Sequence, residues 1–193
     1  MGGLVAGIDE VGRGALAGPV VACAFWIDPK SVDQALLLQV NDSKLIPKKR
    51  REELAKKLSF LSKECVKYSI GTASATEIDE INILQATMVA MKRAYEGMSI
   101  LVDKVIVDGN KTPNVPCPSL AVIGGDRISI SIAAASIIAK VYRDSLMEQL
   151  STEFPQYGWY RNAGYGTKEH RTAIHKFGLS KYHRRSFNVS GSD

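Results

Sequence analysis

Four acidic residues occupy places in this sequence where an α/β sheet would carry its chemistry. Asp9 and Glu10 close the apolar stretch LVAGI, Asp108 closes VIV, and Asp126 follows SLAVIGG. Each lies at or just beyond the C-terminal end of a predicted strand, where open α/β sheets bind their ligands. One Asp-Gly after a strand is usually a turn, but three such ends and an adjacent acid pair are poorly explained as turns. We therefore expect the four carboxylates to converge on one site.

A cluster of this kind calls for a cation. Converging carboxylates repel one another and raise one another's pKa values unless a positive charge neutralises them. An all-oxygen set suits hard divalent ions such as Mg²⁺ or Mn²⁺, and the lack of His and Cys in these segments argues against zinc. Two such ions about 4 Å apart are the usual arrangement for in-line displacement at phosphorus. The acids therefore predict a two-ion site for phosphoryl chemistry.

Two glycine-flanked residues are candidates for reading a substrate. The tripeptide Gly12-Arg13-Gly14 follows the acid pair directly, and its glycines allow close backbone approach while Arg13 can meet a phosphate. Tyr165 lies between two glycines, so its ring can stack on a base or sugar and its hydroxyl can contact a ribose 2′-hydroxyl. Alone, each pattern is more often a turn arginine or a tyrosine packed over a loop. Beside the acids, they indicate a substrate-reading strip.

The histidines and one further acid are weaker candidates. His170 and His175 lie five residues apart on a predicted helix, which does not place them on one face as metal ligands. We therefore assign these two and His183 to the surface or to phosphate contact. Asp144 follows Arg143 late in a helix, where it either adds to the acid site or forms a structural ion pair.

The elements that must position these residues follow from periodicity and turn signals. Strands are predicted at 4–10, 19–27, 66–74, 102–109 and 119–126. Helices are predicted from about Pro47 after a Ser43 cap, from a Thr76 cap to Gly97, at 130–154 and at 168–178. This order of elements favours an α/β layered sheet with helices on both faces.

Length and composition indicate one ordinary globular domain. The chain has 193 residues and is 45% apolar, and it contains no apolar run long enough to cross a bilayer. The N-terminus does not have the pattern of a signal peptide. The three cysteines, Cys23, Cys65 and Cys117, lack CxxC spacing, so free thiols and a reducing compartment are expected. We expect a cytoplasmic protein.

The positive charge is concentrated in two segments. The net charge is +5, yet residues 44–58 carry +5 and residues 161–185 carry +6, which leaves −6 for the rest of the chain. The first segment alone is typical of a solvated amphipathic helix. Aromatic residues and glycines interrupt the second, and we expect the two segments to draw in a polyanion.

Six motifs, taken in order, resemble bacterial ribonuclease HII, of the type 2 ribonuclease H family. They are GIDEVGRG, NDSK, VDGN, the GD followed by AAASIIAKVYRD, GYGTKEH and HRRSF, and they cover residues 7 to 187. The resemblance implies a ribonuclease H-like fold, a five-stranded mixed sheet flanked by helices with a small C-terminal helical segment. It implies one catalytic domain over residues 1–193, with about 155–193 as a helical and basic extension.

The resemblance also implies an activity and its residues. It implies an endonuclease that hydrolyses the RNA strand of RNA–DNA hybrids, and cuts 5′ of single ribonucleotides in duplex DNA, leaving 3′-hydroxyl and 5′-phosphate ends. By matching motif, the catalytic and metal-binding acids are Asp9, Glu10, Asp108 and Asp126, with two Mg²⁺ or Mn²⁺ ions. Gly12, Arg13 and Gly14 would sense the 2′-hydroxyl, Tyr165 would stack near the RNA–DNA junction, and Asn41, Ser43 and Lys44 would hold backbone phosphates. We expect a monomer with no membrane partner.

Departures and alternatives bear on details. Where the family has DSKKL, this chain has DSKLIPKK, so the second lysine is missing or displaced. A non-catalytic nucleic-acid-binding protein would explain the basic segments but not acids at three strand ends. A different two-metal nuclease of the same superfamily would explain the acids but not GRG together with GYG. The first alternative predicts binding without turnover, and the second predicts cleavage of substrates that lack a ribonucleotide.

Overall fold

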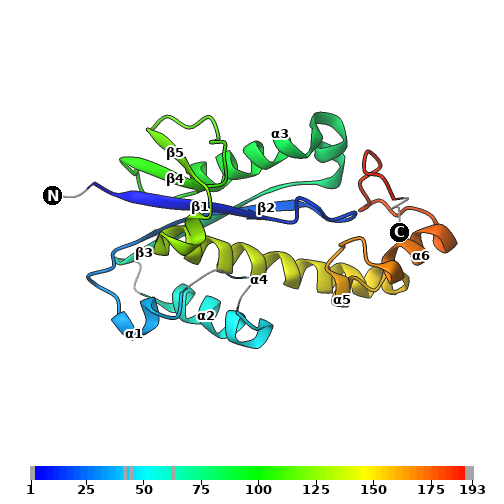
Figure 1. Ribbon diagram of the computed structural model, residues 1–193, viewed down its shortest axis with the longest axis horizontal. Coiled ribbons are helices and arrows are strands. Elements are labelled where there is room, and N and C mark those ends of the chain that lie inside the picture. Colours follow the sequence, from blue (N-terminus) through cyan, green and yellow to red (C-terminus); the bar gives the residue numbers. More distant parts are fainter. Residues whose placement is uncertain (1–2, 41–42, 44–45, 62–63, 190–193) are drawn as a thin grey trace.

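Five strands form one mixed sheet, as expected. A computed structural model describes residues 3–40, 43, 46–61 and 64–189. Its strands are β1 (Val5–Val11), β2 (Val20–Ile27), β3 (Val66–Ala73), β4 (Lys104–Asp108) and β5 (Ser119–Val122). Their order is β3-β2-β1-β4-β5 (Figure 1). Strand β1 pairs antiparallel with β2 and parallel with β4, and β4 pairs parallel with β5. The C-terminal ends of β1, β4 and β5 therefore lie at the same edge of the sheet.

Helices cover both faces of the sheet. The four predicted helices are α2 (Lys48–Phe60), α3 (Ala75–Glu96), α4 (Ile130–Glu153) and α6 (Lys168–Phe177). The helices also include elements that were not predicted: α1 (Gln34–Leu37), α5 (Trp159–Asn162) and the 3₁₀ turns η1 (Gly125–Arg127) and η2 (Pro155–Tyr157). Figure 1 shows α3 on one face, α2 and α4 on the other, and α5 and α6 gathered at the far end of α4.

Two predicted helix caps were wrong. Ser74, not Thr76, begins α3, because Ser74 and Glu77 form a reciprocal capping box in which each side chain accepts from the other's backbone N–H. Helix α2 has Pro47 at its N-cap position, and the Ser43 hydroxyl lies 2.7 Å from that of Ser136 instead. The helix α3 also contains a break at Asn82, whose φ is +65°.

The alternation of strand side chains builds two cores. Along β2, Cys23 and Phe25 pack with α2 and α4, while Ala22 and Ala24 pack with α3. Because both faces are covered, β2 is apolar throughout. Helix α4 crosses β1 at Gly7, where a Cβ would lie 2.3 Å from the helix backbone, so a side chain there would push α4 away from the acid-bearing strand.

A third apolar cluster attaches the C-terminal segment to the rest. Leu16 and Ala17, in the loop after β1, pack with Met147 of α4 and with Tyr157 and Trp159. The loop that carries Gly12-Arg13-Gly14 therefore rests on residues from the other end of the chain. Within the described ranges, the helices include none with the length and apolar character needed to cross a membrane.

Candidate active site

Strand pairing brings the predicted acids to one edge of the sheet. Ile8 of β1 and Val107 of β4 are partners in the parallel ladder, so Asp9 and Asp108 follow at neighbouring positions. Asp126 lies in η1, after the end of β5, and the preceding Gly125 N–H donates to Asp108 Oδ1 at 2.7 Å. The link through Gly125 fixes the turn that carries Asp126 beside Asp108.

The acids gather without forming a ready-made metal-ligand set. Asp9 is partnered across β1–β2 by Cys23 and Glu10 by Ala22, residues of opposite sheet faces, so the pleat sends the two side chains apart. Among the described residues, no three His, Cys, Asp or Glu side chains are arranged to hold a metal ion. Glu10 is instead turned toward Arg13, with Oε1 3.4 Å from Nη1. The strand ends converge as predicted, and the charges of Glu10 and Asp108 both act on Asp9.

The electrostatics of the site favour an added positive charge. Asp9 is only 6% exposed, and its burial, followed by the charge of Glu10, raises its pKa well above the ordinary value. A hydrogen bond from Ser136 opposes this shift, and Asp108 adds to it. Burial likewise raises the pKa of Glu10, against the lowering effect of Arg13. Asp9 and Glu10 are therefore less easily ionised than in water unless a cation joins them.

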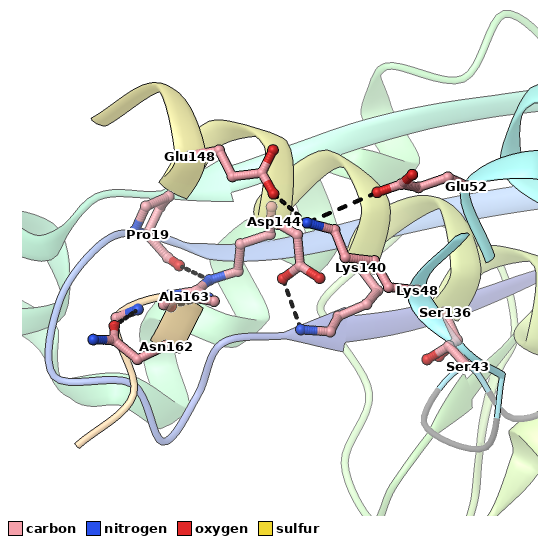
Figure 2. Close-up of polar contacts among 12 residues, drawn as sticks. Pro19, Ser43, Lys48, Glu52, Ser136, Lys140, Asp144, Glu148, Asn162 and Ala163 are labelled. Carbon is pink, nitrogen blue, oxygen red and sulfur yellow. Dashed lines mark hydrogen bonds and ion pairs between the residues drawn. The ribbon is translucent and has the colours of Figure 1, made fainter. Parts of the chain in front are cut away.

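Ser136 is a site residue that sequence reasoning missed. It lies on α4, bonds to the Asp9 carboxylate, and stands 2.7 Å from the Ser43 hydroxyl. Ser43 is 3% exposed, so its hydroxyl faces Ser136 and not the surface (Figure 2). Asn41 and Lys44, predicted beside it, lie outside the described residues. The AAAS pattern of the helix predicted burial but gave no sign that the serine would face an acid.

Two buried arginines hold the loop after β1. Arg184 donates to the carbonyl oxygens of Gly12, Arg13 and Gly18, at 2.6 to 3.0 Å. Arg143 donates to those of Ala17, Pro19 and Ala163, at 2.8 to 3.0 Å. Both side chains are fully buried, and burial lowers the pKa of Arg184 to about 9. These guanidinium groups shape the loop that presents Arg13.

These positions correct part of the basic-segment prediction. Arg184 is fully buried and donates to backbone carbonyls, so it is not available to a polyanion, and the half-buried Arg171 donates to the carbonyl of Gly166 at 3.0 Å. Exposed cations of that segment include Lys168, Lys176 and Arg185. A single sequence gives no signal that separates these three from the buried arginine.

Asp144 forms a structural ion pair, although not with its neighbour in sequence. Its Oδ1 lies 2.7 Å from Nζ of Lys140, one helical turn earlier (Figure 2). In the same view, Lys48 of α2 contacts Glu148 of α4 and lies within 4.0 Å of Glu52. Of these three pairs, Lys48–Glu148 is the one that joins α2 to α4.

Tyr165 lies beside the loop that carries Arg13, as the predicted substrate strip requires. It forms an isolated antiparallel bridge with Ala15, and Leu16 N–H donates to the Gly164 carbonyl at 2.8 Å. The ring centroid is 5.9 Å from Lys140 Nζ and 5.5 Å from Arg143 Cζ, and the ring lines a pocket of about 200 Å³. Gly12, with φ +92°, is confined to glycine because a Cβ would strike Arg143. The two glycine-flanked motifs therefore meet in the fold although they lie far apart in the sequence.

The prediction for the histidines was wrong for two of the three. His170 and His183 are 0% and 2% exposed, and their Nε2 atoms lie 3.1 Å apart. Trp159, Tyr157 and Tyr165 enclose them, because the third apolar cluster closes over this side of α6. Only His175 of the three lies at the surface.

Comparison with known proteins points to one family. The family model described as Ribonuclease HII matches residues 6–190. Ribonuclease HII of Paramagnetospirillum magneticum is 52% identical over 97% of this chain and 91% of its own length. Ribonuclease HII of Rhodospirillum rubrum is 53% identical over 96% and 84%. The crystal structure of ribonuclease H2 from Pyrococcus horikoshii is 27% identical, with a TM-score of 0.77 over 96% and 94% of the two chains.

Proposed function

This chain belongs to the ribonuclease HII family, and on that premise we propose that it nicks duplex DNA 5′ of a single embedded ribonucleotide. As a member it is an endoribonuclease of the ribonuclease H type, acting on the RNA strand of RNA–DNA hybrids. The proposal adds the single-ribonucleotide cut, with 3′-hydroxyl and 5′-phosphate ends. The observation that carries it is the junction of Gly12-Arg13-Gly14 with Tyr165, directly beyond the acids of β1.

The acid edge has donors of the right chemistry for a divalent metal. Asp9, Glu10, Asp108 and Asp126 offer only carboxylate oxygens, which suit Mg²⁺ or Mn²⁺. The raised pKa values of Asp9 and Glu10 mark negative charge that the protein alone leaves incompletely compensated. We assign two such ions to these acids; when bound, they supply an activated water and stabilise the departing 3′-oxygen. The chain's own part is to hold Asp9 in place through Ser136, and Asp108 through the Gly125 N–H.

The loop after β1 supplies the test for a ribose. A Cβ built on Gly14 meets no described atom within 4 Å, so a sugar can approach this backbone closely. The Arg13 side chain is half-exposed, at 51%, and its ion pair with Glu10 keeps the guanidinium beside the acids. Tyr165, bridged to Ala15 of the same loop, offers its ring to the sugar next to the ribose. A deoxyribose lacks the hydroxyl that this surface would bond, so discrimination follows from one missing group.

The exposed lysines of α2 and α6 would attract the duplex, with affinity that falls as salt rises. The phosphate contacts of Asn41, Ser43 and Lys44 remain part of this proposal. Ser43 itself is 3% exposed, and its hydroxyl lies 2.7 Å from that of Ser136.

The test uses a labelled DNA duplex with one central ribonucleotide, an all-DNA duplex and an RNA–DNA hybrid. Each is incubated with the protein in Mg²⁺, in Mn²⁺ or in EDTA. We expect one metal-dependent nick 5′ of the ribonucleotide, which DNA ligase can reseal because the ends are 3′-hydroxyl and 5′-phosphate. Cleavage of the hybrid alone would refute the single-ribonucleotide proposal, and nicking of the all-DNA duplex would refute the role of the loop.

A pair of tyrosine variants separates recognition from general damage. Tyr165→Ala should lower the rate most at the single ribonucleotide and least on the hybrid. Tyr160→Ala is the matched control, since Tyr160 lines the same pocket but is 53% exposed. Equal losses on both substrates for Tyr165→Ala would contradict its role at the junction.

A further inference from the structure

A chain of hydrogen bonds through two buried histidines ends on Tyr165. His170 Nδ1 lies 2.9 Å from the Tyr165 carbonyl oxygen, and its Nε2 lies 3.1 Å from Nε2 of His183. At the other end, His183 Nδ1 accepts from the backbone N–H of Ser180 at 2.9 Å. Trp159 Nε1–H also donates to His170 Nε2, at 3.0 Å. The chain spans the packed side of α6 and reaches the substrate-reading strip.

Two donors fix the protonation of both rings. A backbone N–H and an indole N–H can only donate, so His183 Nδ1 and His170 Nε2 must both be acceptors without a proton. A neutral imidazole with one bare nitrogen carries its proton on the other. His183 therefore donates from Nε2 to His170 Nε2, whose single lone pair it shares with Trp159, and His170 donates from Nδ1 to the Tyr165 carbonyl. The geometry requires both rings to be neutral.

An added proton would break this pattern. A cationic His170 would direct an Nε2–H at two other N–H groups, those of Trp159 and His183. A cationic His183 would have the Ser180 hydroxyl, 2.8 Å away, as the acceptor for Nδ1–H, and the Ser180 N–H would lose its own acceptor. In a buried site, each lost partner is costly.

The two histidines contact both the segment that holds the Arg13 loop and Tyr165, which lies against that loop. His183 forms an isolated bridge with Ala17, and the next residue, Arg184, donates to the carbonyls of Gly12 and Arg13. His170 reaches Tyr165 directly. The two imidazoles thus join the segment that shapes the Arg13 loop to the residue that faces it.

We propose that His170 and His183 are positioning residues that set Tyr165 against the Arg13 loop, and do so only as a neutral pair. The role in recognition rests on the proposed function, whereas the neutral, tautomer-specific pair stands on the geometry alone. The charges of Arg171 and Glu169 on α6 act on His170, and the Tyr157 ring of η2 packs against both imidazoles. Burial, followed by the neighbouring His170, lowers the pKa of His183 to about 4, in keeping with a ring that stays neutral.

The tautomers can be read directly. With only three histidines in the chain, long-range ¹H–¹⁵N correlation spectra of the labelled protein resolve each ring nitrogen. At pH 7 we expect His170 to be protonated at Nδ1 alone and His183 at Nε2 alone, with both still neutral at pH 5.5. A cationic ring at pH 7, or either of the opposite tautomers, would overturn the proposal whatever the enzyme cleaves.

Two substitutions at one position test the positioning role. His170→Asn places an amide N–H where Nδ1 stood and keeps the donor to Tyr165, while His170→Gln places its amide at the Nε2 position and loses that donor. We expect His170→Gln to lower kcat at a single ribonucleotide about tenfold with KM little changed, since small misplacements are costly, and His170→Asn to restore most of it. His175→Gln, exposed on the same helix, is the control.

The outcomes separate the two proposals. Equal kcat for the Asn and Gln variants, with both folded by circular dichroism, would refute the positioning role and leave the proposed function intact. If the wild-type protein cleaved hybrids but no single ribonucleotide, the proposed function would fail. The spectra would then still decide whether the neutral pair exists.

Discussion

Removal of the Asp9 charge should stabilise the protein when divalent ions are absent. The raised pKa of Asp9 means that its ionised form is disfavoured in the fold, first by burial and then by Glu10. Asp9 and Asp108 follow partnered residues on neighbouring parallel strands, which lie about 4.8 Å apart. At an effective dielectric constant of about 20, unit charges about 5 Å apart repel by about 3 kcal/mol, and we expect Glu10 and Asp108 together to act on Asp9 with a repulsion of this order.

The substitution Asp9→Asn removes this repulsion and keeps the shape of the side chain. Its amide oxygen can still accept from the Glu10 N–H, 2.7 Å from Asp9 Oδ1, and from Ser136, although more weakly than a carboxylate does. The weakening costs about 1 kcal/mol. The net gain of about 2 kcal/mol corresponds to a rise in Tm of about 4–8 °C for a chain of this size.

Thermal unfolding followed by fluorescence at pH 7.5, in EDTA and then in Mg²⁺, measures the effect. In EDTA the variant should melt above the wild type, and Mg²⁺ should raise the Tm of the wild type more than that of the variant. Asp28→Asn is the control, because hydrogen bonds from Ser31 and Lys30 lower the pKa of that carboxyl. Removal of this favourable charge should not raise the Tm. The variant should bind hybrid without cutting it. An unchanged or lower Tm in EDTA would refute the charge argument.

Three further predictions concern stability. Arg184→Met leaves three loop carbonyl groups without this donor. It should lower the free energy of unfolding in urea by about 2–4 kcal/mol. The control Arg185→Met, at an exposed position, should change it by less than about 0.5 kcal/mol. The folded pKa of His183, about 4, lies below its ordinary 6.5, so the unfolded chain binds more protons between these values. Stability should therefore fall as the pH drops from about 6.5 toward 4, less steeply in His183→Gln; an equal slope would contradict this. Asn82→Gly relieves the strain of a positive φ but loses the side-chain cap on the Leu84 and Gln85 N–H groups. The free energy of unfolding in urea should rise by about 0.5–1 kcal/mol, and a decrease would show that the cap outweighs the strain.

The strand-end acids could be predicted because their signal is local. An apolar run followed by a carboxylate and a turn marks the end of a strand, and β1 and β4 end within a residue or two of the predicted places. The fifth strand was predicted to run to Asp126 but ends at Val122. Gly124, with φ +66°, turns the chain out of the sheet, and Ile123 before it is 81% exposed. Apolar character alone did not reveal that turn.

The buried cations and histidines could not be predicted from the sequence because their burial depends on distant partners. An arginine or histidine near the end of a basic segment is ordinarily exposed. Arg184 is buried because carbonyl groups some 170 residues earlier need donors, and His170 because Trp159 and His183 close over it. No periodicity or spacing within a single segment records such a match. Ser136 was missed for the same reason, since its partners lie on β1 and beside Ser43.

This difference divides the site into two parts with separate physical origins. The acids are placed by the pairing of β1 with β4 and by the short turn after β5, contacts that the sheet makes in any case. The Arg13 loop has little structure of its own and takes its shape from Arg143, Arg184 and the bridge to Tyr165. On the proposed function, the chemistry of cutting therefore depends on the sheet. The choice of where to cut depends on the C-terminal segment, so a defect there should change specificity before it abolishes hydrolysis.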